Sequence, residues 1–446
     1  MQAKLAKALY RIQERLLSRP SFALLAELER SQYLSRQQIK ALQLKRLSQL
    51  LKTALAHSPW HASRIQAAGI DIEHFTLADL RRLPLMTKDD ARQYRDEIVW
   101  KDAPGGVFRY TTGGSTGEPL IFYFGRKRQA ADAACRMRAR RWWGVEPGDR
   151  EVLLWGAPSE LNATNWIKTV RDRLCNQLLL NAFEMSRAHM DEYLDLIQRF
   201  QPKILYGYAS SLALLAEHAV QRGKKLKLPE LKVVFATGEP LYPHQREVIS
   251  RVFGAPVAAE YGARDAGLIA LESPAGQLLV NSEWIVLELL DEAGKPVQDG
   301  EMGEVVITNL ASEAQPFIRY RTGDMAIKSP SPCREGRGLE VLEEVLGRST
   351  DFIVRADGTV MHALALIYVL REVPGIKQFK IIQEAWDRLR VQIVPTVGWQ
   401  EQNAAAVISG LKQRLGQQAL IQIEYSKTIP PDPSGKYRYV VSQVPR

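Results

Sequence analysis

The stretch KILYGYASSLALLAEHAVQRGKKLKLPELKVVFATG (203–238) decides the fold class. It begins with a short apolar run at 203–208, continues with a helical pattern at 210–223, and ends with a second apolar run at 231–238. Runs of this length, rich in aliphatic and aromatic residues and closed by glycine, are typical of buried strands. A strand, a helix and a strand in succession predict a mainly parallel sheet with helices on its faces.

The same alternation extends to both sides of this stretch. Strands are predicted at 151–157 and 255–262, with a helix at 190–200. After residue 280 the pattern becomes hairpin-like, with WIVLELLD, the turn EAGKP and GEVVITNL. The last part of the chain reads as a separate small unit, with strands near 378–384, 389–395 and 420–425 and a helix near 400–415.

This order of elements predicts an α/β protein of two domains. We expect a large N-terminal domain with mixed and parallel sheets over residues 1–346. A small α+β domain would cover residues 347–446, with a hinge near 347–351. A chain of 446 residues is long enough for two or three domains.

The first 56 residues are predicted to be helical, and they are strongly basic. Leu5, Leu9, Ile12 and Leu16 recur at helical spacing, so we expect them to pack on the rest of the protein. Eleven Lys or Arg residues against three Glu give this segment a net charge of +8. A basic helix could contact a membrane surface, but the sequence favours a mainly structural role.

Composition excludes several classes of protein. The chain has 46% hydrophobic and 25% charged residues, as in an ordinary soluble globular protein. Three cysteines far apart exclude a disulfide framework and fit a reducing compartment. No apolar run approaches the ~20 residues that cross a bilayer, and the N-terminus lacks the apolar core of a signal peptide. We therefore expect a cytoplasmic protein.

A second basic run, RKRQAADAACRMRARR (126–141), holds seven of the chain's cations. We expect these cations to lie on a solvated helix face; the alternative is that they attract a phosphorylated molecule. Zinc-finger spacing, an RRM signature and a GXXG clamp are all absent from the sequence. Nucleic acid is therefore not an expected partner.

The segment TTGGSTGEP (111–119) carries the strongest chemical signal. Its glycines let backbone N–H groups curl around an anion, and its hydroxyl groups add donors for phosphate oxygens. It matches neither the Walker loop nor the dinucleotide fingerprint. Its composition leaves two readings open, a phosphate-binding loop and a flexible surface loop.

Five further segments add polar residues close to glycine. By composition alone, Tyr261 could be a core tyrosine and Asp265 a solvated loop acid, or they could offer a flat ring and a metal-binding carboxylate. Asp324 follows a tight Thr-Gly turn, where a carboxylate can accept both ribose hydroxyls. The segments are FATGEPLYPHQREVI (235–249), EYGARDAGLIALES (260–273), PFIRYRTGDMA (316–326), LGRSTDFIVRADG (346–358) and PPDPSGKYRYVV (430–441).

In this order the six segments resemble the motifs of the adenylate-forming enzymes, which include acyl-CoA synthetases. The short length, the entry LPLMTKDDAR (83–92) and the segments YGYASSLALLA and YGARDAGLIALES are similar to the phenylacetate–CoA ligase family. Within it they resemble the CapK-like branch of capsule and exopolysaccharide biosynthesis. The resemblance covers residues ~84–441 and implies a ligase that uses ATP, Mg²⁺ and CoA.

The resemblance also implies a role for individual residues. Lys436 would be the catalytic residue that stabilises charge during adenylation, and Asp351 would lie at the hinge. The metal shell would include Asp265 and Thr116. The nucleotide would be held by Thr112, Ser115, Thr116, Gly117, Gly238, Glu239, Pro240, Tyr261, Gly262, Asp324 and Arg348. The acyl pocket would be lined by Tyr208, Ala209, Ala236 and Ala263.

The chain departs from the family pattern at three places. Glu118 replaces a lysine that is common in the phosphate loop, and Asp265 replaces a glutamate. The segment GTVMHALALI (358–367) lacks the proline and glutamate of the part that helps form the thioester in the family. Adenylation is therefore the firmer expectation, and transfer to CoA the less firm one.

The sequence thus predicts a ligase that converts a carboxylic acid to an acyl-AMP and then transfers the acyl group, most readily to CoA. An amine or amino-sugar acceptor is the first alternative. A catalytically weak homologue that serves as a scaffold in a polysaccharide complex is the second. The sequence does not identify the acid.

Overall fold

The chain folds into two compact units. The computed structural model describes residues 2–111, 120–155, 172–182, 185–348, 352–354, 360–362, 364–430 and 439–444. The large unit comprises Met1–Thr322 and Ala326–Val345, and the small unit comprises Gly323–Met325 and Leu346–Arg446. In the described part of the chain, no helix is both long and apolar enough to span a bilayer.

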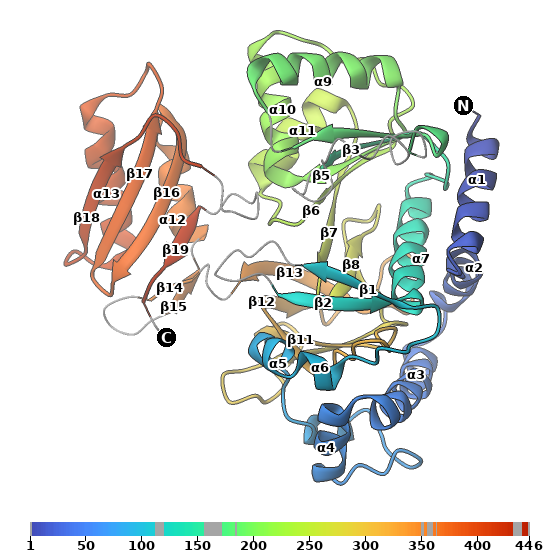
Figure 1. Cartoon of the computed structure of the whole chain (residues 1–446). Helices are drawn as coiled ribbons and strands as arrows, with labels where there is room; N and C mark the ends of the chain where they lie inside the picture. The colour runs from blue at the N-terminus through green and yellow to red at the C-terminus, as the bar shows by residue number, and fades with distance from the viewer. Residues whose placement is uncertain are drawn as a thin grey trace. The chain divides into compact units, whose positions relative to one another are not determined.

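The large unit begins with helices and then alternates strands with helices (Figure 1). Its helices are α1 (Ala3–Leu16), α2 (Ser21–Ser31), α3 (Arg36–His57), α4 (Pro59–Ala67), the 3₁₀ turn η1 (Asp79–Arg82), α5 (Lys88–Gln93), α6 (Arg95–Ile98), α7 (Arg126–Trp142), α9 (Arg187–Phe200), α10 (Ala209–Gln221) and α11 (Pro243–Phe253). The predicted helices at 190–200 and 210–223 are thereby confirmed as α9 and α10.

A mixed sheet of eleven strands forms the centre of this fold, in the order β10-β11-β12-β13-β9-β8-β7-β6-β5-β3-β4. Strands β4, β3, β5, β6 and β7 are parallel, while β7, β8 and β9 are antiparallel. A separate antiparallel ribbon joins β1 (Val107–Thr111) and β2 (Ile121–Gly125). The sheet contains β3 (Glu151–Trp155), β4 (Gln177–Asn181), β5 (Ile204–Tyr208), β6 (Val233–Thr237), β7 (Val257–Ala263), β8 (Gly267–Glu272), β9 (Leu278–Val280), β10 (Ile285–Leu290), β11 (Met302–Asn309), β12 (Tyr320–Lys328) and β13 (Val341–Arg348).

The parallel part of the sheet is covered on both faces, as its continuous apolar runs predict. Every residue of β5 and β6 is buried. Leu205 and Val234 face a hydrophobic cluster with α9, α10 and α11, whereas Tyr206 and Phe235 face a second cluster with α7 and the N-terminal helices. The predicted α/β class is therefore confirmed.

The N-terminal helices are partly as predicted. The helical prediction is confirmed for α3, whose apolar residues Ile39, Leu47 and Leu50 are buried. On α1 the prediction was wrong for three of the four residues, because Leu5, Ile12 and Leu16 are 53%, 52% and 80% exposed, whereas Leu9 is half-buried. The opposite face of α1, which carries Ala6 and Tyr10, contacts the protein instead.

The small unit is built around a four-stranded sheet in the order β18-β17-β16-β19. Strands β16 (Ile376–Ala385) and β17 (Arg388–Pro395) form an antiparallel hairpin, whereas β17 is parallel to β18 (Leu420–Tyr425). The hairpin at 378–395 and the helix near 400–415 are confirmed predictions. The other elements of this unit are β14 (Phe352–Val354), β15 (Val360–His362), α12 (Leu364–Glu372), α13 (Glu401–Leu415) and β19 (Val440–Ser442).

His61 of α4 is a buried histidine held in one neutral form. Its Nε2 lies 3.0 Å from the Pro316 carbonyl oxygen, and its Nδ1 lies 3.0 Å from an Arg64 guanidinium nitrogen. Arg64 can only donate, so Nδ1 accepts and Nε2–H donates. Burial, with a smaller contribution from the Arg64 cation, lowers the pKa of His61 to about 3.

We predict that this histidine makes the protein acid-sensitive. In the unfolded chain its pKa is about 6.5, so between pH 6.5 and 3 the unfolded state binds one more proton than the folded state. The free energy of unfolding should therefore fall as pH falls, by about 2 kcal/mol between pH 7 and pH 5. Urea unfolding of His61→Gln should lack this component, whereas the exposed-site variant His74→Gln should keep it. An equal pH slope in wild type and His61→Gln would contradict the assignment.

Candidate active site

Residues from three of the predicted motifs come together at one edge of the large sheet. Strands β5, β6 and β7 are parallel, and their register pairs Tyr208 with Thr237 and Thr237 with Glu260. The loops that follow these strands therefore leave from the same edge, where open α/β sheets bind ligands. This edge carries Tyr208-Ala209 at the junction of β5 and α10, Gly238–Pro240 after β6, and Tyr261–Ala263 at the end of β7.

The loop after β6 is fixed by a glycine and a carboxylate. Gly238 has a φ of +76°, a left-handed conformation in which L side chains are strained. Oε2 of Glu239 accepts a hydrogen bond of 2.8 Å from the backbone N–H of Ser210, in the first turn of α10. A carboxylate at this position satisfies a free helix N–H and is favoured by the helix dipole. Glu239 therefore ties the loop to α10, and adenine contact by residues 238–240 stays a prediction.

The end of β7 is shaped by close backbone contact. The pairing of β7 with β8 is irregular between Tyr261 and Gly262. A Cβ atom on Gly262 would lie 2.6 Å from the carbonyl oxygen of Gly267, so no side chain fits there. The ring of Tyr261 is half-buried and packs on the hydrophobic cluster of the antiparallel half.

Asp265, the predicted metal residue, is held by three contacts in the connection from β7 to β8. Its Oδ2 accepts a hydrogen bond of 2.6 Å from the Tyr320 hydroxyl, and its Oδ1 accepts one of 3.1 Å from the Ala266 N–H. Arg128 donates to its backbone carbonyl at 3.1 Å. Each carboxylate oxygen retains a second lone pair, so one metal contact is compatible with this geometry.

Within the described ranges, no group of three or more His, Cys, Asp or Glu residues could hold a metal ion. Mg²⁺ commonly takes only one or two protein carboxylates and completes its shell with phosphate oxygens and water. A single carboxylate such as Asp265 therefore fits a magnesium ion that arrives with a nucleotide. It does not fit a dedicated protein metal centre.

Thr111 and Leu120 are the described residues on either side of the glycine-rich segment. The carbonyl of Thr111, which ends β1, accepts a hydrogen bond of 3.3 Å from Arg264. Leu120 is fully buried in the same hydrophobic cluster as Ala266. The residue before this segment thus contacts the connection from β7 to β8, and the residue after it packs in the cluster that contains Ala266.

Several predicted site residues lie outside the described residues. These are Thr112, Ser115, Thr116, Gly117, Asp351 and Lys436. Their roles stay predictions. Asp324 lies in β12 and is half-buried, directly after Gly323, which has a φ of +77°. Arg348 is the last residue of β13.

The predicted acyl-pocket residues differ in their surroundings. Tyr208 is 5% exposed, and its ring stacks on that of Trp155 with centroids 4.2 Å apart. Ala209 and Ala236 are fully buried in the cluster beneath α9, α10 and α11. Ala263 is half-buried at the end of β7. Trp155, which stacks on the predicted residue Tyr208, is thus an aromatic residue at this edge that the sequence analysis did not name.

A buried cluster of charged and polar side chains lies near the ends of β5, β6 and β7. Glu260 receives two hydrogen bonds from Arg136, of 3.0 and 3.1 Å, one of 2.7 Å from the Tyr206 hydroxyl and one of 3.3 Å from Thr237. Burial alone would raise the pKa of Glu260, but the Arg136 cation and the hydrogen bonds from Arg136 and Tyr206 outweigh it and lower that pKa. The cluster joins α7 to β5, β6 and β7. The sequence signal for it was the position of Glu260 directly before Tyr261.

The basic run at 126–141 is not a solvated face, so that expectation was wrong. It forms α7, and every residue of this helix is buried or half-buried. Each of its seven cations has a partner inside the protein. The partners are Gln129 for Arg126, Glu313 for Lys127, Asp132 for Arg128, Glu260 for Arg136, Glu283 for Arg138, Glu151 for Arg140, and Glu29 with Glu146 for Arg141. Six of the seven cations therefore neutralise carboxylates of the protein, and Arg126 bonds to an amide.

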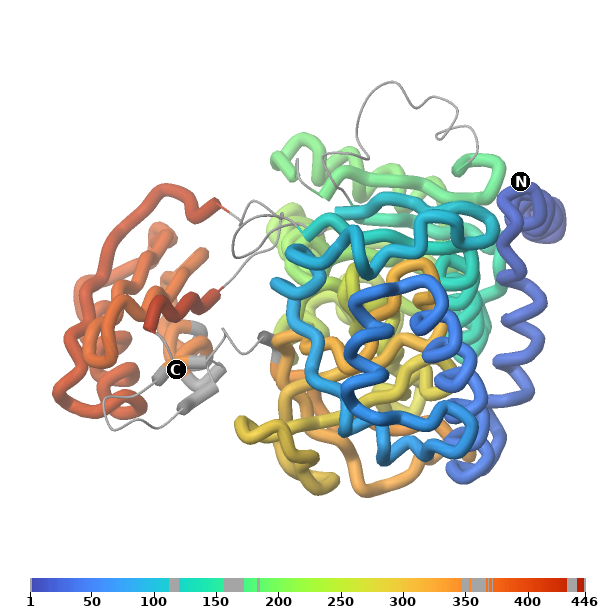
Figure 2. The backbone as a smooth tube through the Cα atoms, turned by 60° about the horizontal axis from the view of Figure 1, so that its bottom comes forward, coloured from blue at the N-terminus to red at the C-terminus, as the bar shows by residue number. Residues whose placement is uncertain are grey.

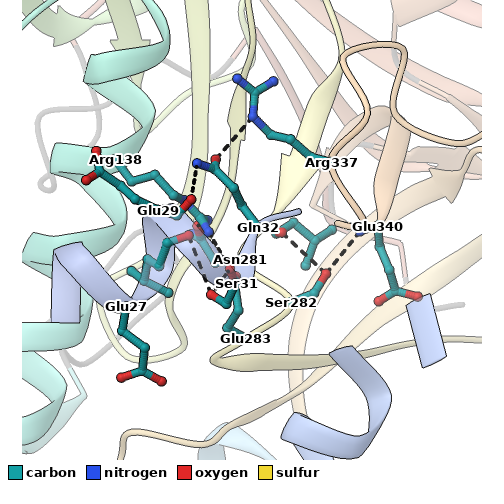
Figure 3. A network of polar contacts seen from close by, with 12 residues as sticks. Glu27, Glu29, Ser31, Gln32, Arg138, Asn281, Ser282, Glu283, Arg337 and Glu340 are labelled. Atoms are coloured by element: carbon teal, nitrogen blue, oxygen red, sulfur yellow. Dashed lines mark hydrogen bonds and ion pairs between the residues drawn. The ribbon is translucent and has the colours of Figure 1, made fainter. Parts of the chain in front are cut away.

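Figure 3 shows the most buried part of this network. Arg138 and Glu283 are both 0% exposed at their side chains and lie 2.5 Å apart. Arg138 also donates to Asn281 at 2.8 Å, and Ser31 of α2 donates to Glu283 at 3.0 Å. The pair thereby joins α7 and α2 to the loop before β10.

Comparison with known proteins agrees with this geometry. The AMP-binding enzyme family matches residues 89–311, and the CapK C-terminal domain family matches residues 353–443. Protein CapK of Staphylococcus aureus is 23% identical over 407 residues, which cover 90% of this chain and 89% of that protein. Phenylacetate-coenzyme A ligase of Escherichia coli (strain K12) is 27% identical over 325 residues, covering 71% and 72%.

Solved structures share the fold. A crystal structure of 2-hydroxyisobutyryl-CoA ligase in the postadenylation state has a TM-score of 0.73 and 22% identity, and the match covers 93% of this chain and 92% of that one. The amide bond synthetase McbA from Marinactinospora thermotolerans has a TM-score of 0.55 and 20% identity, covering 76% and 68%. The AMP-binding match spans half of the chain and includes the strand ends that carry the site. This chain therefore belongs to the AMP-binding enzyme family and is an adenylate-forming ligase of the CapK-like branch.

Proposed function

We propose that this ligase activates a carboxylic acid with ATP and Mg²⁺ and transfers the acyl group to CoA. The observation that carries the proposal is the convergence at one sheet edge. Thr111, which precedes the hydroxyl-rich segment 112–119, accepts a hydrogen bond from Arg264 in the connection after β7, and Leu120, which follows it, packs in the same hydrophobic cluster as Ala266. The phosphate-binding composition between these two residues, together with the ring of Tyr261 and the carboxylate of Asp265, supports a nucleotide site.

Two half-reactions follow from this assignment. In the first, a carboxylate oxygen of the acid attacks the α-phosphorus of ATP, the bond from that phosphorus to the bridging oxygen breaks, and pyrophosphate leaves. In the second, the thiol sulfur attacks the acyl carbon, AMP leaves with the bonding electrons, and the thiol proton is lost to solvent. Neither step needs an enzyme nucleophile, since positioning and electrostatic stabilisation carry such transfers.

Most of the predicted site residues would bind parts of the nucleotide. Ser115, Thr116 and Gly117 would donate to phosphate oxygens, while Asp324 and Arg348 would hold the ribose. The 238–240 loop and Tyr261 would contact the adenine. Mg²⁺, bound through phosphate oxygens, Asp265 and Thr116, would supply charge neutralisation for the departing pyrophosphate.

The acceptor is the finer part of the proposal. The names phenylacetate-coenzyme A ligase and 2-hydroxyisobutyryl-CoA ligase among the similar proteins support CoA. The absence of proline and glutamate from GTVMHALALI (358–367), together with the similarity to an amide bond synthetase, favours an amine as the second candidate. The match to the CapK C-terminal domain supports a place in polysaccharide biosynthesis, as a source of activated acyl groups.

An ATP–pyrophosphate exchange assay over aryl, fatty, amino and uronic acids tests the first half-reaction. We expect label exchange that depends on one class of acid. The second half-reaction is tested by adding CoA or an amino-sugar nucleotide to the best acid and measuring AMP release and product mass. A thioester and CoA-dependent AMP release are expected. If only the amine drives turnover, the acceptor is an amine and not CoA. If no acid supports exchange, the chain does not catalyse adenylation.

We predict that Asp324→Ala weakens ATP binding by roughly 1–3 kcal/mol, because the ribose hydroxyls lose their acceptor. Tyr261→Ala should act in the same direction, since a ring that can stack on the base is removed. Isothermal titration with a non-hydrolysable ATP analogue measures both affinities. The exposed-site variants Asp299→Ala and Tyr33→Ala are the controls and should bind as wild type does. Unchanged affinity in both site variants would disprove this nucleotide site.

A further inference from the structure

Helix α1 is fixed to the large unit by one face only. Ala6 is fully buried, and the Tyr10 ring packs edge-on against Phe22 with centroids 5.5 Å apart. Lys7 pairs with Glu146 at 2.8 Å, and Gly148 comes so close that a Cβ on it would lie 2.5 Å from the Lys7 nitrogen. These contacts leave α1 no freedom to rotate its other face inward.

The other face of α1 has two parts, which follow from the helical period of 3.6 residues. Leu5, Ile12 and Leu16 form an apolar strip, and these side chains are about half exposed or more, at 53%, 52% and 80%. Lys4 and Arg15 are exposed and lie along the edge of this strip that carries Ile12. Arg11 is also exposed and lies further round the helix on the same side. In Figures 1 and 2, α1 runs along the outer edge of the large unit, with no other described element beyond it.

No exposed carboxylate balances these cations on α1. The helix is described throughout, and its one acid, Glu14, is 1% exposed. Glu14 is bonded to Arg19 and to the Ser21 hydroxyl, so it faces inward. The exposed charge of the helix is therefore entirely positive.

The segment that contains Cys175 contacts α1. The thiol of Cys175 lies 3.9 Å from Oε1 of Gln13, and the residue before it, Leu174, is 46% exposed. Arg173 is exposed as well. A second segment thus adds one apolar and one cationic side chain next to α1.

We propose that this outer face of α1 binds the surface of an anionic membrane. A helix with Leu and Ile on one side and Lys and Arg on the other lies in the membrane interface, with its apolar side chains among the lipid chains and its cations at the headgroups. The affinity comes from both parts, so binding would be reversible and would weaken as salt screens the cations.

A second copy of this chain fits the same face less well. Two copies related by a two-fold axis would bring the same cations together with no carboxylate on α1 to pair them. A stable protein interface also buries about 800 Å² on each partner, more than three or four side chains of one short helix provide. Charge and area therefore both favour the lipid surface.

The test measures co-sedimentation of the full chain with vesicles. Vesicles of equal parts phosphatidylcholine and phosphatidylglycerol should bind the protein, vesicles of phosphatidylcholine alone should not, and high salt should release it. Ile12→Glu with Leu16→Glu should lower the partition coefficient about tenfold or more. The matched control, Met302→Glu with Val397→Glu, makes the same change at two other exposed apolar residues and should bind as wild type does.

A second pair of variants tests the charge. Lys4→Gln with Arg15→Gln should lower binding to the mixed vesicles about 25-fold, or roughly fivefold per cation. Thermal unfolding should be unchanged in every variant, because the altered side chains are exposed. Equal binding by the α1 variants and the control pair, or no preference for anionic vesicles, would overturn the proposal. A wild-type dimer in light scattering that the Ile12→Glu, Leu16→Glu protein loses, without vesicle binding, would assign the face to a second copy.

Discussion

Replacing Lys436 with alanine should lower the rate of acyl-AMP formation by ~10²-fold or more, the scale observed when one preorganised donor to a transition state is removed. In the proposed mechanism its ammonium group stabilises the negative charge that builds as pyrophosphate leaves. The measurement is ATP–pyrophosphate exchange with the best acid of the panel. Lys377→Ala, at an exposed lysine of the same unit, is the control and should exchange as wild type does.

The same variant should transfer the acyl group of a pre-made acyl-adenylate at close to the wild-type rate. The first half-reaction creates the charge that Lys436 stabilises, whereas the second does not involve the pyrophosphate. An equal loss in both half-reactions, with thermal unfolding unchanged, would show that Lys436 does not have this role. No loss in either would remove it from the site altogether.

Replacing Arg138 with methionine should lower the free energy of unfolding by about 3–5 kcal/mol, the range measured when one partner of a buried ion pair is removed. Glu283 would stay at the same place with 0% exposure and without its cation. Urea unfolding at neutral pH measures the difference. Arg251→Met is the matched control, because Arg251 is exposed and lies 3.9 Å from the exposed Glu247. It should change stability by less than ~0.5 kcal/mol.

The double variant Arg138→Met, Glu283→Gln tests the cause. It removes both charges, so it should regain a large part of the stability lost in Arg138→Met. If the double variant is no more stable than the single one, packing and not the unpaired charge explains the loss. If Arg138→Met is as stable as Arg251→Met, the pair does not hold α2 and α7 against the sheet.

Local patterns in the sequence were sufficient for the secondary structure of both units. The apolar run of β6 and the helical period of α10 are set by neighbouring residues. Thr87 is the N-cap of α5, with the Asp90 side chain accepting from the Thr87 N–H and the Asp90 N–H donating to the Thr87 hydroxyl. Such elements could be predicted because period, capping and turn chemistry act over a few residues.

The same holds for the motifs. The glycine-rich segment, the YGARD segment and the loop after β6 were recognised by composition and order. The YGARD segment and the loop after β6 meet at one edge because β6 and β7 are parallel, as the alternation of strands and helices predicted. Composition does not predict which residues each side chain contacts. Glu239 bonds to α10, and Asp265 bonds to Tyr320.

The sequence by itself determined the α/β class, the order of the elements and the membership of an adenylate-forming family, because these depend on local periodicity and on motifs in a fixed order. Only the tertiary structure decided which way the helices face. Arg138 of α7 turns inward because Glu283, far away in the sequence, offers it a buried carboxylate. Leu5 and Leu16 of α1 turn outward because Ala6 and Tyr10 on the opposite face pack against the protein. Both outcomes depend on partners from distant segments, and a single helix does not encode its partners.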